Sequence, residues 1–182
     1  GLQYTYHNAK NAEAFGVELD IRKNLDFIGL RGLSLVCNAA YIYSRVRFED
    51  GAPERDRPLA GQSPYLVNAG LFYQHDDKGI SASLLYNRIG KRIESVGVPM
   101  QNESEDIPDI YEMPRNSLDL TFSKKIGKFV EIKAGVQDLL NSKVEYKQFV
   151  KLTDENGGKR EREQLIRSYR PGVDINVGVS LK

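Results

Sequence analysis

Residues 15–22 read FGVELDIR, and every second side chain in this stretch is apolar. The apolar positions are Phe15, Val17, Leu19 and Ile21. Successive side chains of a β-strand point to opposite faces of a sheet, whereas the apolar positions of a helix recur every three or four residues. The stretch therefore predicts a β-strand with one apolar and one polar face.

The same alternation returns three more times, in residues 118–123, 130–137 and 173–181. Three further apolar segments have strand-like composition, at residues 30–48, 64–74 and 79–96. Together these segments predict an all-β fold, an antiparallel up-and-down meander of about seven strands that occupies the whole of residues 1–182.

The connections between these strands alternate in length. Three are short and turn-like, at residues 26–29, 75–79 and 126–128, and the three between them are long and polar, at residues 49–63, 97–114 and 153–163. Bacterial outer-membrane barrels have short periplasmic turns and longer extracellular loops. The alternation therefore predicts part of a transmembrane β-barrel in the outer membrane, with the C-terminus in the periplasm.

Seven strands alone cannot be inserted in a membrane as an open sheet, because the unpaired backbone groups of an open edge cost several kcal/mol each in hydrocarbon. We expect the remaining strands, and a secretory leader, to lie upstream of this sequence. The sequence contains no apolar run of the roughly 20 residues that a transmembrane helix needs. An isolated fragment could cover its apolar face by pairing its edge strands with another copy.

Composition excludes several classes of function. The chain has 26 basic and 25 acidic residues, a formal net charge of +1, so no nucleic-acid partner is expected. Its single cysteine, Cys37, excludes a disulfide framework, and neither a metal site nor a cofactor is predicted. The two histidines, His7 and His75, fall at opposite ends of the predicted strands, so we expect no catalytic site and no enzyme activity.

Four segments in order resemble TonB-dependent outer-membrane receptors, in particular those of Bacteroides-type bacteria. They are residues 11–20, with Gly16-Val17-Glu18-Leu19; residues 57–65, RPLAGQSPY; the bend Asp138-Leu139-Leu140-Asn141; and Tyr169-Arg170-Pro171-Gly172 before the final strand. The set covers nearly the whole chain. One departure is the end at Leu181 and Lys182, where such receptors usually finish on an aromatic residue.

The resemblance implies a 22-stranded barrel closed by an N-terminal plug domain, of which this chain is the C-terminal portion. It implies energy-coupled uptake of a scarce nutrient such as a ferric siderophore, haem, cobalamin or glycan. The implied partners are the TonB energy-transducing complex, which acts through the N-terminal region, the lipid and lipopolysaccharide of the outer membrane, and the small-molecule nutrient.

Two sets of candidate functional residues follow from the strand pattern and the loops. The candidates for facing the barrel lumen are Glu18, Asp20, Arg22, Asp119, Glu131 and Lys133. They either contact the plug or pair with one another across strands, and the sequence leaves both readings open. The candidates for ligand contact in the extracellular loops are Arg55, Arg57, Glu103, Glu105, Asp106 and Asp109.

Two other functions remain open at this point. One is a soluble β-sandwich or small-barrel binding module that presents its long loops to a partner. The other is a barrel hydrolase, which would need His7 or His75 as a general base. The acidic residues of 103–109 could bind a hard cation, although such a run is more often a solvated loop.

Overall fold

The computed structural model describes residues 8–100, 106–153 and 158–181, and their regular structure is almost entirely β. Seven strands form one antiparallel sheet, in the order β1 (Asn11–Asn24), β2 (Leu33–Arg47), β3 (Tyr65–His75), β4 (Ile80–Ile89), β7 (Arg115–Ile126), β8 (Val130–Gln137) and β11 (Asp174–Leu181). Four more form a second sheet, in the order β10 (Lys159–Tyr169), β9 (Val144–Thr153), β6 (Ile110–Glu112) and β5 (Arg92–Ser95). The all-β prediction is confirmed.

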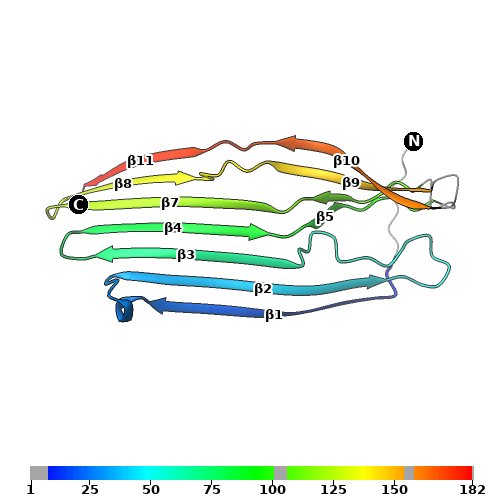
Figure 1. The fold of residues 1–182 in the computed structure, drawn as a ribbon, viewed down its shortest axis with the longest axis horizontal. Coiled ribbons are helices and arrows are strands. Elements are labelled where there is room, and N and C mark those ends of the chain that lie inside the picture. Colours follow the sequence, from blue (N-terminus) through cyan, green and yellow to red (C-terminus); the bar gives the residue numbers. More distant parts are fainter. Residues whose placement is uncertain (1–7, 101–105, 154–157, 182) are drawn as a thin grey trace.

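The second sheet prolongs the first. Four passes of the chain run from one sheet into the other, as β4–β5, β6–β7, β8–β9 and β10–β11, with short breaks at residues 90–91, 113–114, 138–143 and 170–173. With β1, β2 and β3 these make the seven antiparallel passes that the alternation predicts. The strands lie side by side in a single layer (Figure 1). A soluble sandwich of two facing sheets is therefore not what the described residues form.

Tight turns and long connections lie at opposite ends of the larger sheet (Figure 1). The β1–β2 connection holds a single 3-10 turn, η1 (Asp26–Ile28), and the β3–β4 and β7–β8 connections span residues 76–79 and 127–129. Gly79 and Gly127 have positive φ angles of 58° and 61°, which non-glycine residues rarely adopt. The connections at the other end span residues 48–64 and 96–109 and the β9–β10 hairpin. The segregation predicted from the sequence is confirmed.

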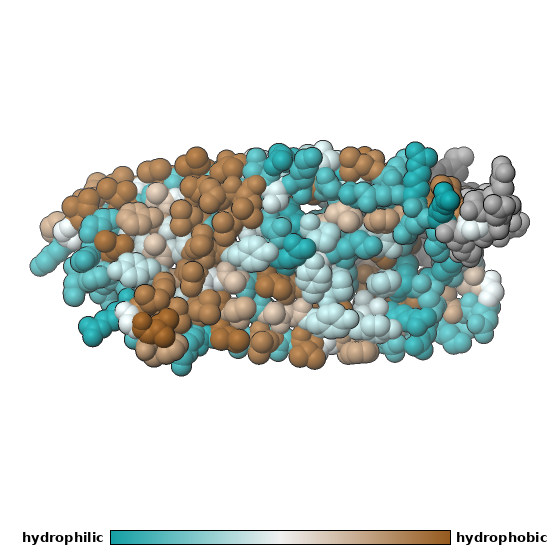
Figure 2. Space-filling model, viewed as in Figure 1, coloured by the Kyte–Doolittle hydropathy of each residue, from teal (hydrophilic) through white to brown (hydrophobic). Residues whose placement is uncertain are grey.

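The strand register gives the larger sheet one continuous apolar face and one mainly polar face, which also carries Val36, Phe72 and Leu85, because directly paired residues lie on the same face. One row of the apolar face runs from Leu35 through the paired residues Leu71, Leu84, Leu120, Val136 and Ile175. The opposite face carries rows of small polar side chains, including the bonded pairs Ser83–Thr121 and Ser81–Ser123, each 2.7 Å apart between hydroxyl oxygens. Apolar side chains gather over the half of the sheet nearest the tight turns (Figure 2).

Very little of this apolar surface is covered. The chain exposes 13195 Å², whereas a globular monomer of 20.6 kDa exposes about 8,900 Å². On the edge strands, Val17 is 74% exposed and Val177 is 73% exposed. The apolar face and both edges of the larger sheet are therefore exposed in this structure. Burial of this surface requires a partner or an apolar environment.

The packed core lies at the long-loop end. The buried hydrophobic residues among those described are Val46, Ile93, Val144 and Tyr146. Three of the four lie on β5 and β9 and the fourth near the end of β2. This small core holds the second sheet and the loop of residues 48–64 together, which positions the candidate site described below.

Two segments predicted as loops contain strands. Residues 97–114 include β6, and residues 153–163 include the end of β9 and the beginning of β10. The reason is that these strands belong to the smaller sheet and lie beyond the apolar face of the larger sheet. Neither of their faces needs to be apolar, so their sequences do not alternate between apolar and polar residues. β10 begins with Lys-Arg-Glu-Arg-Glu, which has no apolar residue.

The DLLN segment forms the bend between β8 and β9. Asp138 and Asn141 adopt left-handed φ angles of 52° and 43°, and the Asn141 amide donates to the Asp138 carbonyl over 2.7 Å. Aspartate and asparagine tolerate this conformation better than most residues. Asn141 also holds the last pass, since its carbonyl accepts from Arg170 Nη1 over 2.6 Å and its side chain accepts from the Gly172 amide over 3.1 Å.

Among residues 8–100, 106–153 and 158–181 there is no helix with the length and hydrophobicity needed to span a bilayer.

Candidate functional site

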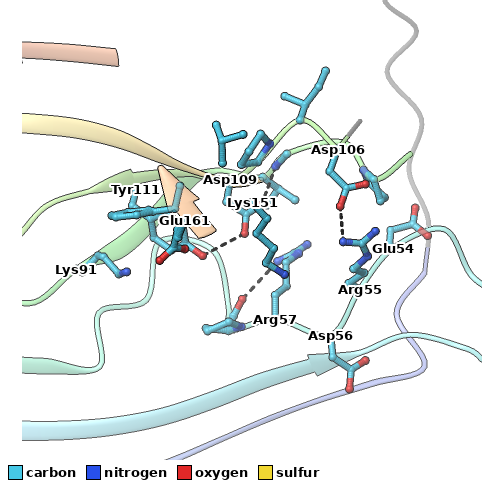
Figure 3. Close-up of a pocket in the computed structure, with 18 residues that line it drawn as sticks. Glu54, Arg55, Asp56, Arg57, Lys91, Asp106, Asp109, Tyr111, Lys151 and Glu161 are labelled. Carbon is cyan, nitrogen blue, oxygen red and sulfur yellow. Dashed lines mark hydrogen bonds and ion pairs between the residues drawn. The ribbon is translucent and has the colours of Figure 1, made fainter. Parts of the chain in front are cut away.

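The long-loop end of the molecule encloses a pocket of about 340 Å³ (Figure 3). Its walls come from two long connections, at residues 54–58 and at residues 96–99 and 106–109, and from the smaller sheet. Segments that lie far apart in the sequence thus meet at one cavity.

Backbone pairing fixes both loops. Residues 48–64 are held beside the end of β2, where Val46 and Arg57 exchange backbone hydrogen bonds of 2.7 and 3.2 Å. In the second loop, Val98 and Ile107 exchange two bonds of 2.9 Å. The walls are therefore built on paired backbone.

Gly97 allows the second loop to close. A Cβ atom at this position would lie 1.9 Å from the Ile107 carbonyl oxygen, closer than any real contact. The Gly97 amide donates to Asp109 Oδ1 over 2.8 Å. Only glycine fits this approach of two backbone segments.

We expect Gly97→Ala to open this loop, since the added methyl group forces the two backbone segments apart. Hydrogen exchange of the Val98 and Ile107 amides should accelerate about tenfold or more, which corresponds to an overpacking cost of about 1–3 kcal/mol. Gly178→Ala is the matched control, because a Cβ there meets nothing within 4 Å. Unchanged exchange in Gly97→Ala would contradict this view of the loop.

The pocket has mixed charge, and its carboxylates are already engaged. Arg55 forms an ion pair with Asp106, which joins the two loops across the pocket (Figure 3). Asp106 also accepts a hydrogen bond from the Met100 amide over 2.8 Å. Asp56 pairs with Arg45 over 2.9 Å. The carboxylates therefore stabilise the loops.

An aromatic pair forms another part of the lining. Tyr111 and Phe149 meet edge to face with ring centroids 5.7 Å apart, and Lys91 Nζ lies 4.5 and 4.6 Å from the two centroids. Burial raises the pKa of the Tyr111 hydroxyl, and nearby Asp109 raises this pKa further. Tyr111 therefore remains a neutral hydrogen-bond donor at physiological pH, beside a cation and an apolar ring.

The candidate loop contacts meet at this pocket. Arg55, Arg57, Asp106 and Asp109 all line it, whereas Glu103 and Glu105 lie outside the described residues. The sequence reasoning missed Lys91, in the break between β4 and β5, and the strand residues of the lining, which are Tyr111, Phe149, Val150, Lys151 and Glu161. Lys147, Phe149 and Lys151 are spaced two residues apart, so they lie on one face of β9. This spacing is the feature of the sequence that could have pointed to the part of the lining on β9.

The candidate lumen residues all lie on the polar face of the larger sheet. Their positions follow from the register of β1, β7 and β8 against neighbouring strands. Several bond to neighbours on this face: Glu18 accepts from Asn38 Nδ2 over 2.6 Å, Asp20 pairs with Arg22 over 3.2 Å and Glu131 with Lys133 over 3.5 Å. These contacts lie within the sheet, and contact with a plug stays a prediction.

The described residues do not bring the two histidines together in a catalytic site. His7 lies outside the described residues, and His75 ends β3 beside the tight turn, where its Nδ1 accepts from the Lys78 amide over 3.4 Å. In the described part of the chain, no group of three His, Cys, Asp or Glu side chains is placed to hold a metal ion. The pocket offers hydrogen bonds and charge for binding.

The fold and pocket define an all-β, up-and-down antiparallel protein with an amphipathic sheet and a pocket at its long-loop end. The chain is 29% identical over 152 residues to transferrin-binding protein A of Haemophilus influenzae. The aligned part is 76% of this chain, and it spans only 16% of that relative. No family model and no solved structure matches the chain.

Proposed function

We propose that this chain forms part of the wall of an outer-membrane β-barrel, as the C-terminal barrel portion of a TonB-dependent receptor for a scarce nutrient. The observation that carries the proposal is the single-layer sheet with one continuous apolar face, whose tight turns and long loops lie at opposite ends. In an outer-membrane barrel, lipid is what covers the apolar face of such a sheet.

Orientation follows from the loops. The long loops and their pocket face the outside of the cell, and the tight turns and the end of β11 face the periplasm. The exposed edges β1 and β11 pair with further strands that close the barrel, and the polar face then lines the lumen and contacts the plug. Lipopolysaccharide and lipid surround the apolar face.

In this proposal the nutrient contacts the pocket at the long-loop end. The relative is named for binding transferrin, which supports an iron source as the first nutrient to test. A ferric siderophore, haem, cobalamin and a glycan are the other candidates. The Bacteroides-type origin stays a prediction, since the relative comes from Haemophilus influenzae.

Growth on single iron sources tests the function directly. A strain that lacks the complete receptor should lose growth on one source and regain it when the gene is restored. The same restored strain without TonB should again fail to grow, because release of the nutrient inward needs energy coupling. Equal uptake with and without TonB would overturn the energy-coupled part of the proposal.

A further inference from the structure

Arg88 is a cation on the apolar face of the larger sheet. It lies on β4 and pairs with Val67 on β3 and with Asn116 on β7. Its row continues through Ala39 to Leu19, both on the apolar face. On a lipid-facing surface, arginine costs about 2–4 kcal/mol at the midplane and about 0–1 kcal/mol near the interface. Arg88 therefore marks the border of the apolar band on the long-loop side.

The partners of Arg88 are all neutral. Its Nη1 donates to Asn116 Oδ1 over 2.7 Å and its Nε to the Tyr65 hydroxyl over 3.3 Å, while the Tyr86 hydroxyl donates to the same Asn116 oxygen over 2.8 Å. These bonds orient the guanidinium and leave its charge uncompensated. Tyrosine is the residue that membrane interfaces favour.

Other arginines near this border have a carboxylate partner. Arg45 pairs with Asp56 over 2.9 Å, Arg47 with Glu13 over 3.0 Å and Arg92 with Glu112 over 2.7 Å. No carboxylate among the described residues forms an ion pair with Arg88. Its charge therefore has no ion-pair partner within residues 8–100, 106–153 and 158–181.

The cluster also has unused donors. Within the described part of the chain, Arg88 Nη2 and Asn116 Nδ2 make no hydrogen bond, and the Tyr65 hydroxyl, which accepts from Arg88, keeps its own proton to donate. Three donors around one positive charge suit a phosphate group, whose oxygens accept several hydrogen bonds. Lipid headgroups present phosphates at this depth of a bilayer.

We propose that Arg88, Tyr65 and Asn116 bind the phosphate of an outer-leaflet lipid headgroup. The inference rests on the proposed function, because it requires the apolar face to lie in lipid. It adds a specific lipid site at the border of the band, with Tyr86 holding Asn116 in place. The bound lipid would fix the height of the sheet in the membrane.

The test uses the complete receptor in detergent and measures retained lipid by native mass spectrometry. The probes are lipid A with two phosphates, the same lipid A without phosphates, and inorganic phosphate. The proteins are the wild type, Arg88→Gln, Tyr65→Phe, and Lys125→Gln, which removes a cation from the polar face near the tight turns. Arg88→Gln should weaken binding of phosphorylated lipid A about tenfold, as loss of a charged hydrogen bond requires.

Tyr65→Phe should weaken the same binding by about threefold, and it remains informative if Arg88→Gln fails to fold. Lys125→Gln should bind as the wild type does. Equal binding of phosphorylated lipid A to wild type and Arg88→Gln would overturn the inference, as would competition by inorganic phosphate or an equal loss in Lys125→Gln. A wild-type receptor that retains none of these lipids would also overturn the inference, while the proposed function would still stand or fall on the growth test.

Discussion

Leu120→Arg should lower the free energy of unfolding of the membrane-inserted receptor by about 2–4 kcal/mol, the cost of an arginine at the lipid midplane. Leu120 lies in the middle of β7, on the apolar face, paired with Leu84 and Val136. Folding into liposomes, followed by denaturant titration, measures the change. In cells, the amount of assembled receptor should fall accordingly.

Thr121→Arg is the matched control, one residue further along the same strand. Thr121 lies on the polar face, where its hydroxyl bonds to that of Ser83 over 2.7 Å. Its replacement should cost about 0.5–1.5 kcal/mol for the lost hydrogen bond and should leave insertion intact. Equal effects of the two substitutions would contradict the assignment of the faces.

Asp138→Asn should destabilise the receptor by about 2 kcal/mol, because it leaves the Arg115 charge without its partner. Asp138 forms an ion pair with Arg115, and their side chains are 12% and 26% exposed. Its amide also donates to Asp119 Oδ1 over 2.8 Å, which ties the bend to β7. Asparagine tolerates the left-handed backbone of this position, so the change tests the charge and not the turn.

A double-mutant cycle with Arg115→Met separates the pair from its surroundings. The double variant should lose less stability than the sum of the single variants, since neither charge is then left alone. Asp174→Asn, an exposed carboxylate on β11, should change the stability by less than about 0.5 kcal/mol. If Asp138→Asn behaves like Asp174→Asn, the ion pair does not hold the bend.

The sequence predicted the passes of the chain because each strand of the larger sheet has a local signal, and it predicted the faces of those strands whose apolar residues alternate. In β11, and in β1 from Phe15 onward, every apolar residue faces one side, so a period of two is enough to place the strand. The breaks between the sheets carry no alternation signal, although two of them, at residues 138–143 and 170–173, fall at the DLLN and YRPG segments that the resemblance marked. They depend on contacts between distant residues, such as the bond from Arg170 to the Asn141 carbonyl.

The candidate site was predictable in its loops and not in its strands. Polar loop composition pointed to Arg55, Arg57, Asp106 and Asp109, which line one pocket. Tyr111 was assigned to a loop because β6 has only three residues, and its strand exists through pairing with β5 and β9. Such pairing joins residues that lie far apart in the chain. The periodicity of a short stretch of sequence does not predict it.

Lipid accessibility along β4 tests the central claim, that one face of this sheet lies in the membrane. In a Cys37→Ser background of the complete receptor, nitroxide labels are attached to Ser81→Cys, Ala82→Cys, Ser83→Cys and Leu84→Cys. Labels at positions 82 and 84 should collide with lipid-dissolved oxygen, and labels at 81 and 83 with a water-soluble nickel complex. Equal accessibility of all four labels to the nickel complex would contradict the claim.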